Sequence, residues 1–239
     1  EKLKAVTFHE TLGTLAHTAR RLEGLVAGLA AGVGLCGEGG DVSGDGHGVP
    51  VEHLVRAAGL AKADLVSQVV IEFPTLQGTM GELYARHAGL PEAVPRAVGE
   101  HKLPLSATAP CPETLAGAIL AVAEKADNIA GAWVAGEKPS GSRDPYGLRR
   151  AAMGIVRIAL EHDLRVAVPG LLASALDWYE AQGVVELADG EQHVLVKEMA
   201  AFVWERLEAL LLDEGLPYAL VQAALGAPAG DVPAKAARA

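Results

Sequence analysis

The sequence predicts an all-α fold, and three observations support this class. Apolar residues recur at steps of three and four from Leu12 to Leu29, which is the period of an amphipathic helix. The segment 113–134 is long and mostly apolar, which indicates a helix buried at the centre of the fold. No segment alternates apolar and polar residues between hairpin turns, so no sheet is predicted.

The first half of the chain should form helices separated by glycine and proline. Thr7 and Glu10 have the spacing of a capping box, which predicts the start of the first helix. Residues 32–50 are rich in glycine and poor in apolar side chains, so we expect a loop there. A second helix should begin at Pro50 and continue until Phe73-Pro74 interrupts it. Further helices are expected over 76–87, 91–101, 113–134, 145–162, 169–182, 193–213 and 217–225.

Turn and tail signals organise the second half. Asp144 and Pro145 follow a Ser-Gly-Ser turn, so we expect Asp144 to cap a helix in which Pro145 takes the first position. Residues 184–196 have room for a short strand, although none is predicted. The tail 226–239 consists mostly of small residues, is interrupted by proline and should be frayed.

The composition limits the possible functions. A net charge of −10 argues against a protein that coats nucleic acid through its global field, so any contact with RNA must be local. Cys36 and Cys111 are far apart and in no metal-ligand spacing, which indicates free thiols in a reducing compartment. There is no apolar run long enough to span a membrane and no signal core at the start, so a cytoplasmic location is expected. Because the chain begins at Glu1 without a methionine, we expect an internal piece of a longer protein.

Three short motifs resemble functional ones but lack the required context. The glycines at 32, 34 and 37 follow a helix rather than a strand, so a dinucleotide loop is not predicted. Residues 136–142 lack the spacing with which a phosphate-binding loop places its lysine. The His162-Asp163 doublet lies at an expected helix end, where it should form a turn.

A second set of residues resembles the HD-type metallo-phosphohydrolases, in which imidazoles and carboxylates on several helices hold a divalent ion that activates water. His9, Asp64, Glu124 and Asp127 lie at the corresponding places, but Ala63 replaces the histidine of the His-Asp pair. We therefore predict a degenerate HD-like helical bundle with no catalytic residue and no bound metal. The carboxylates would instead bond to neighbouring helices or to lysine and arginine.

Longer blocks of sequence are similar to the β-subunit of bacterial glycyl-tRNA synthetase, in the same order along the chain. Weaker similarity continues through Trp204–Leu207 and Gly215–Tyr218, so the resemblance spans nearly the whole chain. Gln68, Glu124 and Arg143 depart mildly from the family's usual residues. The five main blocks are VTFHETLGT (6–14), KADLV (62–66), EFPTLQG (72–78), EHKLP (100–104) and SGSRDPYGLRRAA (140–152).

The resemblance implies a division into an HD-like domain at 1–165, followed by a smaller helical extension at 166–239 that leads into an anticodon-binding region. It implies that the family's α-subunit carries the active site for glycine and ATP, in an α2β2 glycine-tRNA ligase that uses ATP and Mg²⁺. This chain would bind no cofactor itself. It would contribute binding of tRNA(Gly) and assembly, and would be inactive alone.

An acidic chain must contact RNA through a local group of cations. The best candidates are in or next to the expected loop and helix start at 140–150, where backbone amides also face outward. Alternatively, Arg149 and Arg150 pair with carboxylates such as Asp127 or Glu72. Two other functions remain open, a metal-dependent HD-type phosphohydrolase and a purely structural scaffold. The candidate tRNA-binding residues are Lys138, Arg143, Arg149, Arg150 and Arg157.

Overall fold

The fold is all-α apart from one minimal hairpin, as the sequence predicts. This computed structural model describes residues 2–32, 48–139, 144, 146–226 and 231–237. Short segments precede and link the helices: η1 Lys2–Ala5, β1 Thr7–His9, β2 Gly13–Thr14, η2 Ala63–Val66 and η3 Pro74–Leu76. The α-helices are α1 Leu15–Gly32, α2 Val51–Leu60, α3 Gln68–Glu72, α4 Thr79–His87, α5 Ala93–Glu100, α6 Leu115–Val134, α7 Leu148–Glu161, α8 Val168–Ala181, α9 Glu191–Asp213, α10 Tyr218–Gly226 and α11 Val232–Ala236.

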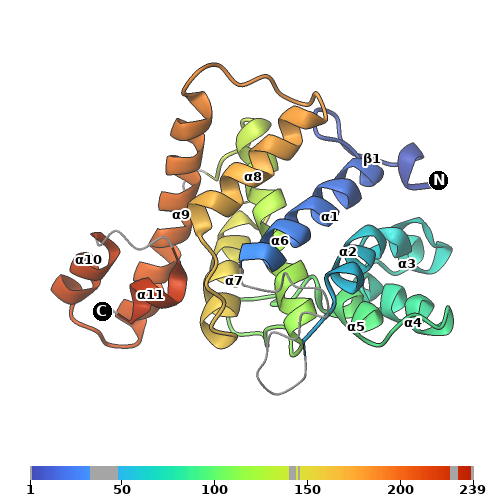
Figure 1. The fold of residues 1–239 in the computed structure, drawn as a ribbon, viewed down its shortest axis with the longest axis horizontal. Coiled ribbons are helices and arrows are strands. Elements are labelled where there is room, and N and C mark those ends of the chain that lie inside the picture. The colour runs from blue at the N-terminus through green and yellow to red at the C-terminus, as the bar shows by residue number, and fades with distance from the viewer. Residues whose placement is uncertain (1, 33–47, 140–143, 145, 227–230, 238–239) are drawn as a thin grey trace.

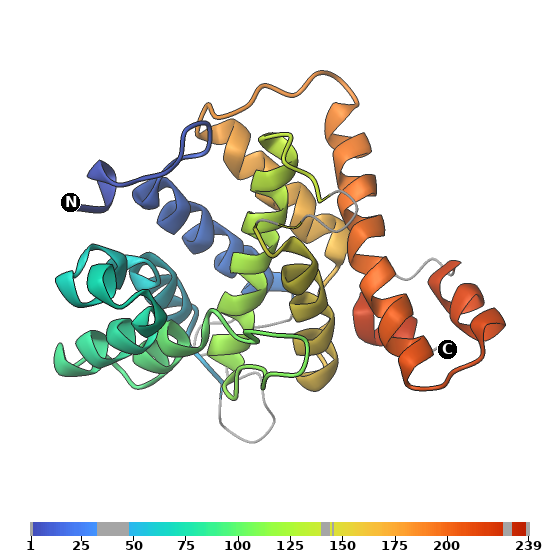
Figure 2. The same cartoon turned by 180° about the vertical axis from the view of Figure 1, so that it is seen from behind.

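Helix α6 is the centre of the fold, as its apolar sequence predicts. It is buried along nearly its whole length and packs against α1, α2, α5, α7, α8 and α9. Figures 1 and 2 show α1 and α8 on one side of α6 and α7 on the other. The group α2–α5 lies at one end of the molecule, and α9–α11 lie at the opposite end (Figure 1). Among the described helices, none is long and apolar enough to cross a membrane.

The expected capping box at the N-terminus is wrong, because this segment forms a hairpin. Thr7 pairs with Thr14 and His9 with Gly13, and α1 begins only at Leu15. Gly13 has a φ of +87°, a conformation that side chains other than glycine rarely adopt, and it allows the chain to reverse before the helix. The backbone amide of Leu15 then donates to Val6 at 3.0 Å.

The second predicted helix, expected from Pro50 to Phe73, is divided into α2, η2 and α3, and η3 follows it at Pro74. Asp64 is the reason, because its carboxylate Oδ2 accepts hydrogen bonds from the amides of Gly78 at 2.6 Å and Gly81 at 3.1 Å. This contact folds the chain back on itself after α2. Ser67 then starts α3, since its hydroxyl accepts a bond from the amide of Val70.

One expectation about a helix start needs correction, and the expectation of no strand in 184–196 does not. Asp144 does bind the start of α7, accepting from the amides of Leu148 at 2.7 Å and Arg149 at 2.9 Å, but α7 begins at Leu148 rather than at residue 145. Pro145 lies outside the described residues. Residues 184–196 contain no strand, and α9 begins within them.

The described C-terminal residues 231–237 are more ordered than predicted. Asp231 caps α11 by accepting from the amide of Ala234 at 2.7 Å, and it forms a backbone bridge with Ala167. Val232 is fully buried, so this part of the tail is packed rather than frayed. Helix α8, which follows the predicted boundary at 165–166, packs against α1 and α6. The division into two domains stays a prediction.

Candidate functional site

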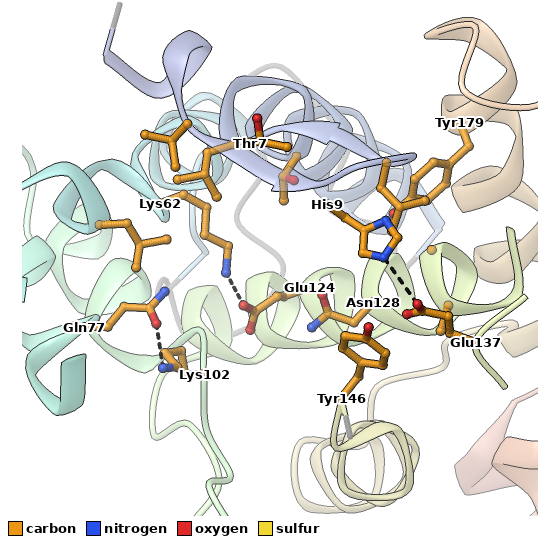
Figure 3. A pocket seen from close by; sticks show the side chains of 17 residues that line it. Thr7, His9, Lys62, Gln77, Lys102, Glu124, Asn128, Glu137, Tyr146 and Tyr179 are labelled. Carbon is orange, nitrogen blue, oxygen red and sulfur yellow. Dashed lines mark hydrogen bonds and ion pairs between the residues drawn. The ribbon is translucent and has the colours of Figure 1, made fainter. Parts of the chain in front are cut away.

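A cavity of about 560 Å³ opens between the N-terminal hairpin and one face of α6 (Figure 3). Glu124, Asn128 and Gly131 form its floor, since residues three and four apart share one face of a helix. Tyr179 from α8 closes one side. Its hydroxyl donates to the carbonyl of Asp127 at 3.2 Å, and Gly131 leaves room for that approach.

One end of the cavity has the hairpin as its wall. His9 Nε2 lies 3.5 Å from Glu137 Oε1, and His9 Nδ1 lies 3.0 Å from the Thr11 hydroxyl. The ring of Tyr146 meets the His9 ring edge to face, with 6.5 Å between centroids. A hydrogen bond to Glu137 raises the pKa of Tyr146.

The other end holds a buried ion pair between Lys62 and Glu124. Burial alone would raise the pKa of Glu124, but Lys62, together with His101 and Lys125, outweighs burial and lowers it to about 2. The Lys102 ammonium lies beside this pair and donates to Gln77 Oε1 at 2.7 Å. Glu124 is therefore a permanent anion that is already neutralised by a cation of the protein.

His101 lies behind this pair and is completely buried. Its Nδ1 donates to the carbonyl of Val98 at 2.6 Å, and its Nε2 lies 3.8 Å from Glu124 Oε1 without a hydrogen-bond partner among the described residues. Burial, with the charge of Lys62, lowers the pKa of His101 to about 4. The ring is therefore neutral at physiological pH.

Asp64 and Asp127 both turn away from the cavity. Asp64 binds the glycine amides described above, and its Oδ1 has no partner among the described residues. Asp127 pairs with the buried Arg21, whose Nε lies 2.6 Å from Oδ1 and whose Nη2 lies 3.2 Å from Oδ2. The Arg21 guanidinium also covers the Tyr179 ring at 4.0 Å. The cationic partner that the structure gives Asp127 is thus Arg21, which the alternative with Arg149 or Arg150 did not include.

The residues present do not fit an HD-type metal. His9 lies at one end of the cavity, Asp64 faces backbone amides, and Lys62 neutralises Glu124. Within the described ranges, no three histidine, cysteine or acidic side chains come together in a way that could hold a metal ion. A divalent cation needs several such donors at once, and here each is bound to something else.

The candidate tRNA-binding residues differ in exposure and in partners. Lys138 pairs with Glu198 at 2.5 Å on the surface, and Arg150 is exposed, with Nη1 3.4 Å from the carbonyl of Leu105. Arg157 is half-buried and donates to the carbonyl of Ala109 at 2.7 Å, so it holds the segment before α6. Arg149 is half-buried at the start of α7. Arg143 lies outside the described residues.

Sequence reasoning missed three residues of the cavity region, namely Lys62, His101 and Lys102. Lys62 directly precedes the Ala63-Asp64 pair, and the chain turns so that Lys62 rather than Asp64 lines the cavity. His101 and Lys102 stood in one of the quoted sequence blocks. A buried charge must be paired or neutralised, so a carboxylate on a helix expected to be buried indicates that it has a partner, without saying which residue that partner is.

The His162-Asp163 doublet forms a turn, as predicted. His162 ends α7 and its Nε2 lies 2.8 Å from the carbonyl of Pro112, while Asp163 has a φ of 48°. Cys111 is buried, which raises the pKa of its thiol to about 11. Cys36 lies outside the described residues.

The all-α bundle and its ion-paired carboxylates define a helical domain without a metal-binding set among its described residues. The sequence profile of the "Glycyl-tRNA synthetase beta subunit" family matches residues 1–226, so the chain belongs to this family. The resemblance of the quoted sequence blocks is thereby confirmed.

Proteins named glycine-tRNA ligase beta subunit are similar to almost the entire chain. The one from Solidesulfovibrio magneticus is 42% identical over 240 residues, covering 100% of this chain and 32% of the relative. Those from Nitratidesulfovibrio vulgaris (strain Miyazaki F) and Syntrophomonas wolfei are 43% and 40% identical, covering 95% and 97% of this chain and 30% and 31% of the relatives. The chain therefore spans about a third of the length of these relatives.

Proposed function

We propose that this chain is a tRNA-binding and assembly module in the β-subunit of a glycine-tRNA ligase. The observation that supports it is the family match over residues 1–226. The chemical step would take place on an α-subunit in an α2β2 assembly, with ATP and Mg²⁺ used by the whole enzyme. The chain itself would bind no cofactor, would be inactive alone and would work in the cytoplasm.

The proposed contact with tRNA(Gly) is the segment from Lys138 to Arg157. Lys138 is half exposed, and its partner Glu198 is exposed as well. A surface ion pair of this kind contributes little to stability, so an RNA phosphate can replace Glu198 at low cost. Arg150 adds an exposed guanidinium at the start of α7. Arg157 donates to the carbonyl of Ala109 in the segment before α6.

Replacing Lys138 and Arg143 by alanine in the complete enzyme should raise the Michaelis constant for tRNA about tenfold, which corresponds to a loss of about 1.4 kcal/mol of binding. Glycine-dependent ATP–pyrophosphate exchange should stay unchanged, because it needs no tRNA. The slope of log affinity against log salt should fall by about two units if each cation neutralises one phosphate.

The matched control replaces Arg165 and Lys197 by alanine, since both are exposed cations outside this segment. This control should charge tRNA like the parent. If the test variant also does so at physiological salt, the contact lies elsewhere or the module is the scaffold considered above.

The rival function, a metal-dependent HD-type phosphohydrolase, gives a different result in elemental analysis. Because the donors are already paired, we expect no stoichiometric zinc, manganese or iron in the purified chain, and no turnover of ATP or of a phosphodiester. Stoichiometric metal that is lost in the His9→Ala variant, or hydrolysis that is lost in the Asp64→Ala variant, would instead support the phosphohydrolase function.

A further inference from the structure

The cavity above α6 has two chemically different ends. The ammonium groups of Lys62 and Lys102 lie at one end, and the rings of His9 and Tyr146 lie at the other (Figure 3). The floor between them is polar at Asn128, the side chain of which stands at the centre of the view. A pocket with this order of groups matches a ligand that is anionic at one end and flat at the other.

Positive charge exceeds negative charge at the lysine end. The Lys102 ammonium is repelled by two cations, Lys62 and Arg150. It is attracted by two carboxylates, those of Glu124 and Asp64. With Lys102 itself and Lys125 behind the pair, four cations and two carboxylates surround this end, and of these Lys62, Lys102 and Glu124 line the cavity. Burial, with the neighbouring cations, lowers the pKa of Lys102, and an anion placed there would relieve this repulsion.

Free hydrogen-bonding groups remain in this region. An ammonium has three donors, and Gln77 takes one of those of Lys102. Asn128 is half-buried, and its amide makes no side-chain hydrogen bond within the part of the chain that the structure describes. The Asn128 amide can therefore donate to and accept from a ligand in the cavity.

The dimensions fit a small molecule. Pockets for such ligands have roughly 300 to 1,000 Å³, and this one has about 560 Å³. The floor from Glu124 to Ala132 spans eight helical steps, or about 12 Å at about 1.5 Å per residue. One nucleotide can lie along it, whereas a folded RNA cannot enter.

We propose that this cavity binds a nucleoside monophosphate unit, with its phosphate between Lys62 and Lys102, its sugar over Asn128 and its base against Tyr146 and His9. Both lysines are donors for phosphate oxygens, and bases stack on aromatic rings in a sequence-tolerant way. The unit is either a free nucleotide or the end nucleotide of an RNA strand, since both present the same groups. The inference does not depend on the tRNA contact proposed at Lys138–Arg157, because its phosphate site is Lys62 and Lys102, although Tyr146 and Arg150 lie in that segment.

Isothermal titration calorimetry of the 239-residue chain with AMP tests this site. AMP should bind at least about tenfold more tightly than adenosine, because adenosine has no phosphate to form a charge-assisted hydrogen bond with the lysines. Lys102→Gln should weaken AMP binding by about tenfold, and Asn128→Leu should weaken it as well by removing the amide and filling the floor. Lys197→Gln, the same change on an exposed lysine outside the cavity, should bind AMP like the parent.

Competition with a short single-stranded RNA distinguishes the two sources. If the RNA displaces AMP and Lys102→Gln weakens both, the ligand is the end of an RNA strand; if the RNA does not compete, the ligand is a free nucleotide. The proposal is wrong if neither AMP nor the RNA binds at millimolar concentration, or if Lys102→Gln binds AMP like the parent. Circular dichroism checks that the Asn128→Leu variant is folded. If this variant is unfolded, the result for Lys102→Gln alone decides whether the proposal holds.

Discussion

Replacing Arg21 by methionine is expected to lower the free energy of unfolding by about 3–5 kcal/mol, the usual cost of leaving one half of a buried ion pair behind. Arg21 and Asp127 are almost completely inaccessible, and Arg21 also donates to Thr18 and to Gln182. Without the guanidinium, the Asp127 carboxylate stays buried with no cation. Burial already raises the pKa of Asp127 despite Arg21. Urea denaturation followed by circular dichroism measures the loss.

Arg86→Met is the matched control for this change. Arg86 pairs with Glu82 and Glu92 on the surface, so its loss should cost less than about 1 kcal/mol. The double variant R21M/D127L should recover much of the stability, because it removes both charges rather than one. Equal costs for Arg21→Met and Arg86→Met would show that the buried pair does not stabilise the fold.

Acidification from pH 6.5 to pH 4 should lower the free energy of unfolding by up to about 3 kcal/mol through His101 alone, since each pKa unit corresponds to about 1.36 kcal/mol. The folded pKa of His101 lies near 4, below its ordinary 6.5. Between these two pH values His101 is protonated in the unfolded chain but not in the folded chain. The free energy of unfolding therefore decreases as the pH is lowered. Glu124 extends the loss from its ordinary 4.5 down to about 2, because its carboxylate form is stabilised in the fold.

His101→Asn isolates the first of these windows, because asparagine keeps a donor near the Nδ1 position but does not titrate. The variant should show a shallower dependence of unfolding free energy on pH between 6.5 and 4 than the parent. His193→Asn changes an exposed histidine on α9 and should keep the parental slope. An unchanged slope in His101→Asn would mean that His101 is not buried in its neutral form.

The main helices could be predicted because their signals are local. The steps of three and four that define α1, and the apolar run of α6, depend only on neighbouring residues. The division of the second predicted helix could not be predicted in this way. It depends on Asp64 reaching the amides of Gly78 and Gly81, a contact that the periodicity of 50–73 does not contain.

The candidate site was predicted only in part, because its partners come from distant segments. Glu124 was identified, but its cation Lys62 is separated from it by 62 residues, and Arg21 is separated from Asp127 by 106. Composition and spacing carry no information on such pairs. They follow instead from packing, which turns α6 so that Glu124 faces the cavity and Asp127 faces α1.

Helix α6 is both the centre of the core and the floor of the cavity. Its polar side chains Glu124 and Asn128 therefore extend from a backbone that is already immobilised by packing on every side. The backbone entropy of placing them is lost when the chain folds, so it is not lost again when a ligand arrives. The same arrangement limits how the cavity can change in evolution. Any change in its floor is made on the same helix as Ala123, Ala126 and Ala130, which are completely buried and leave no room for larger side chains.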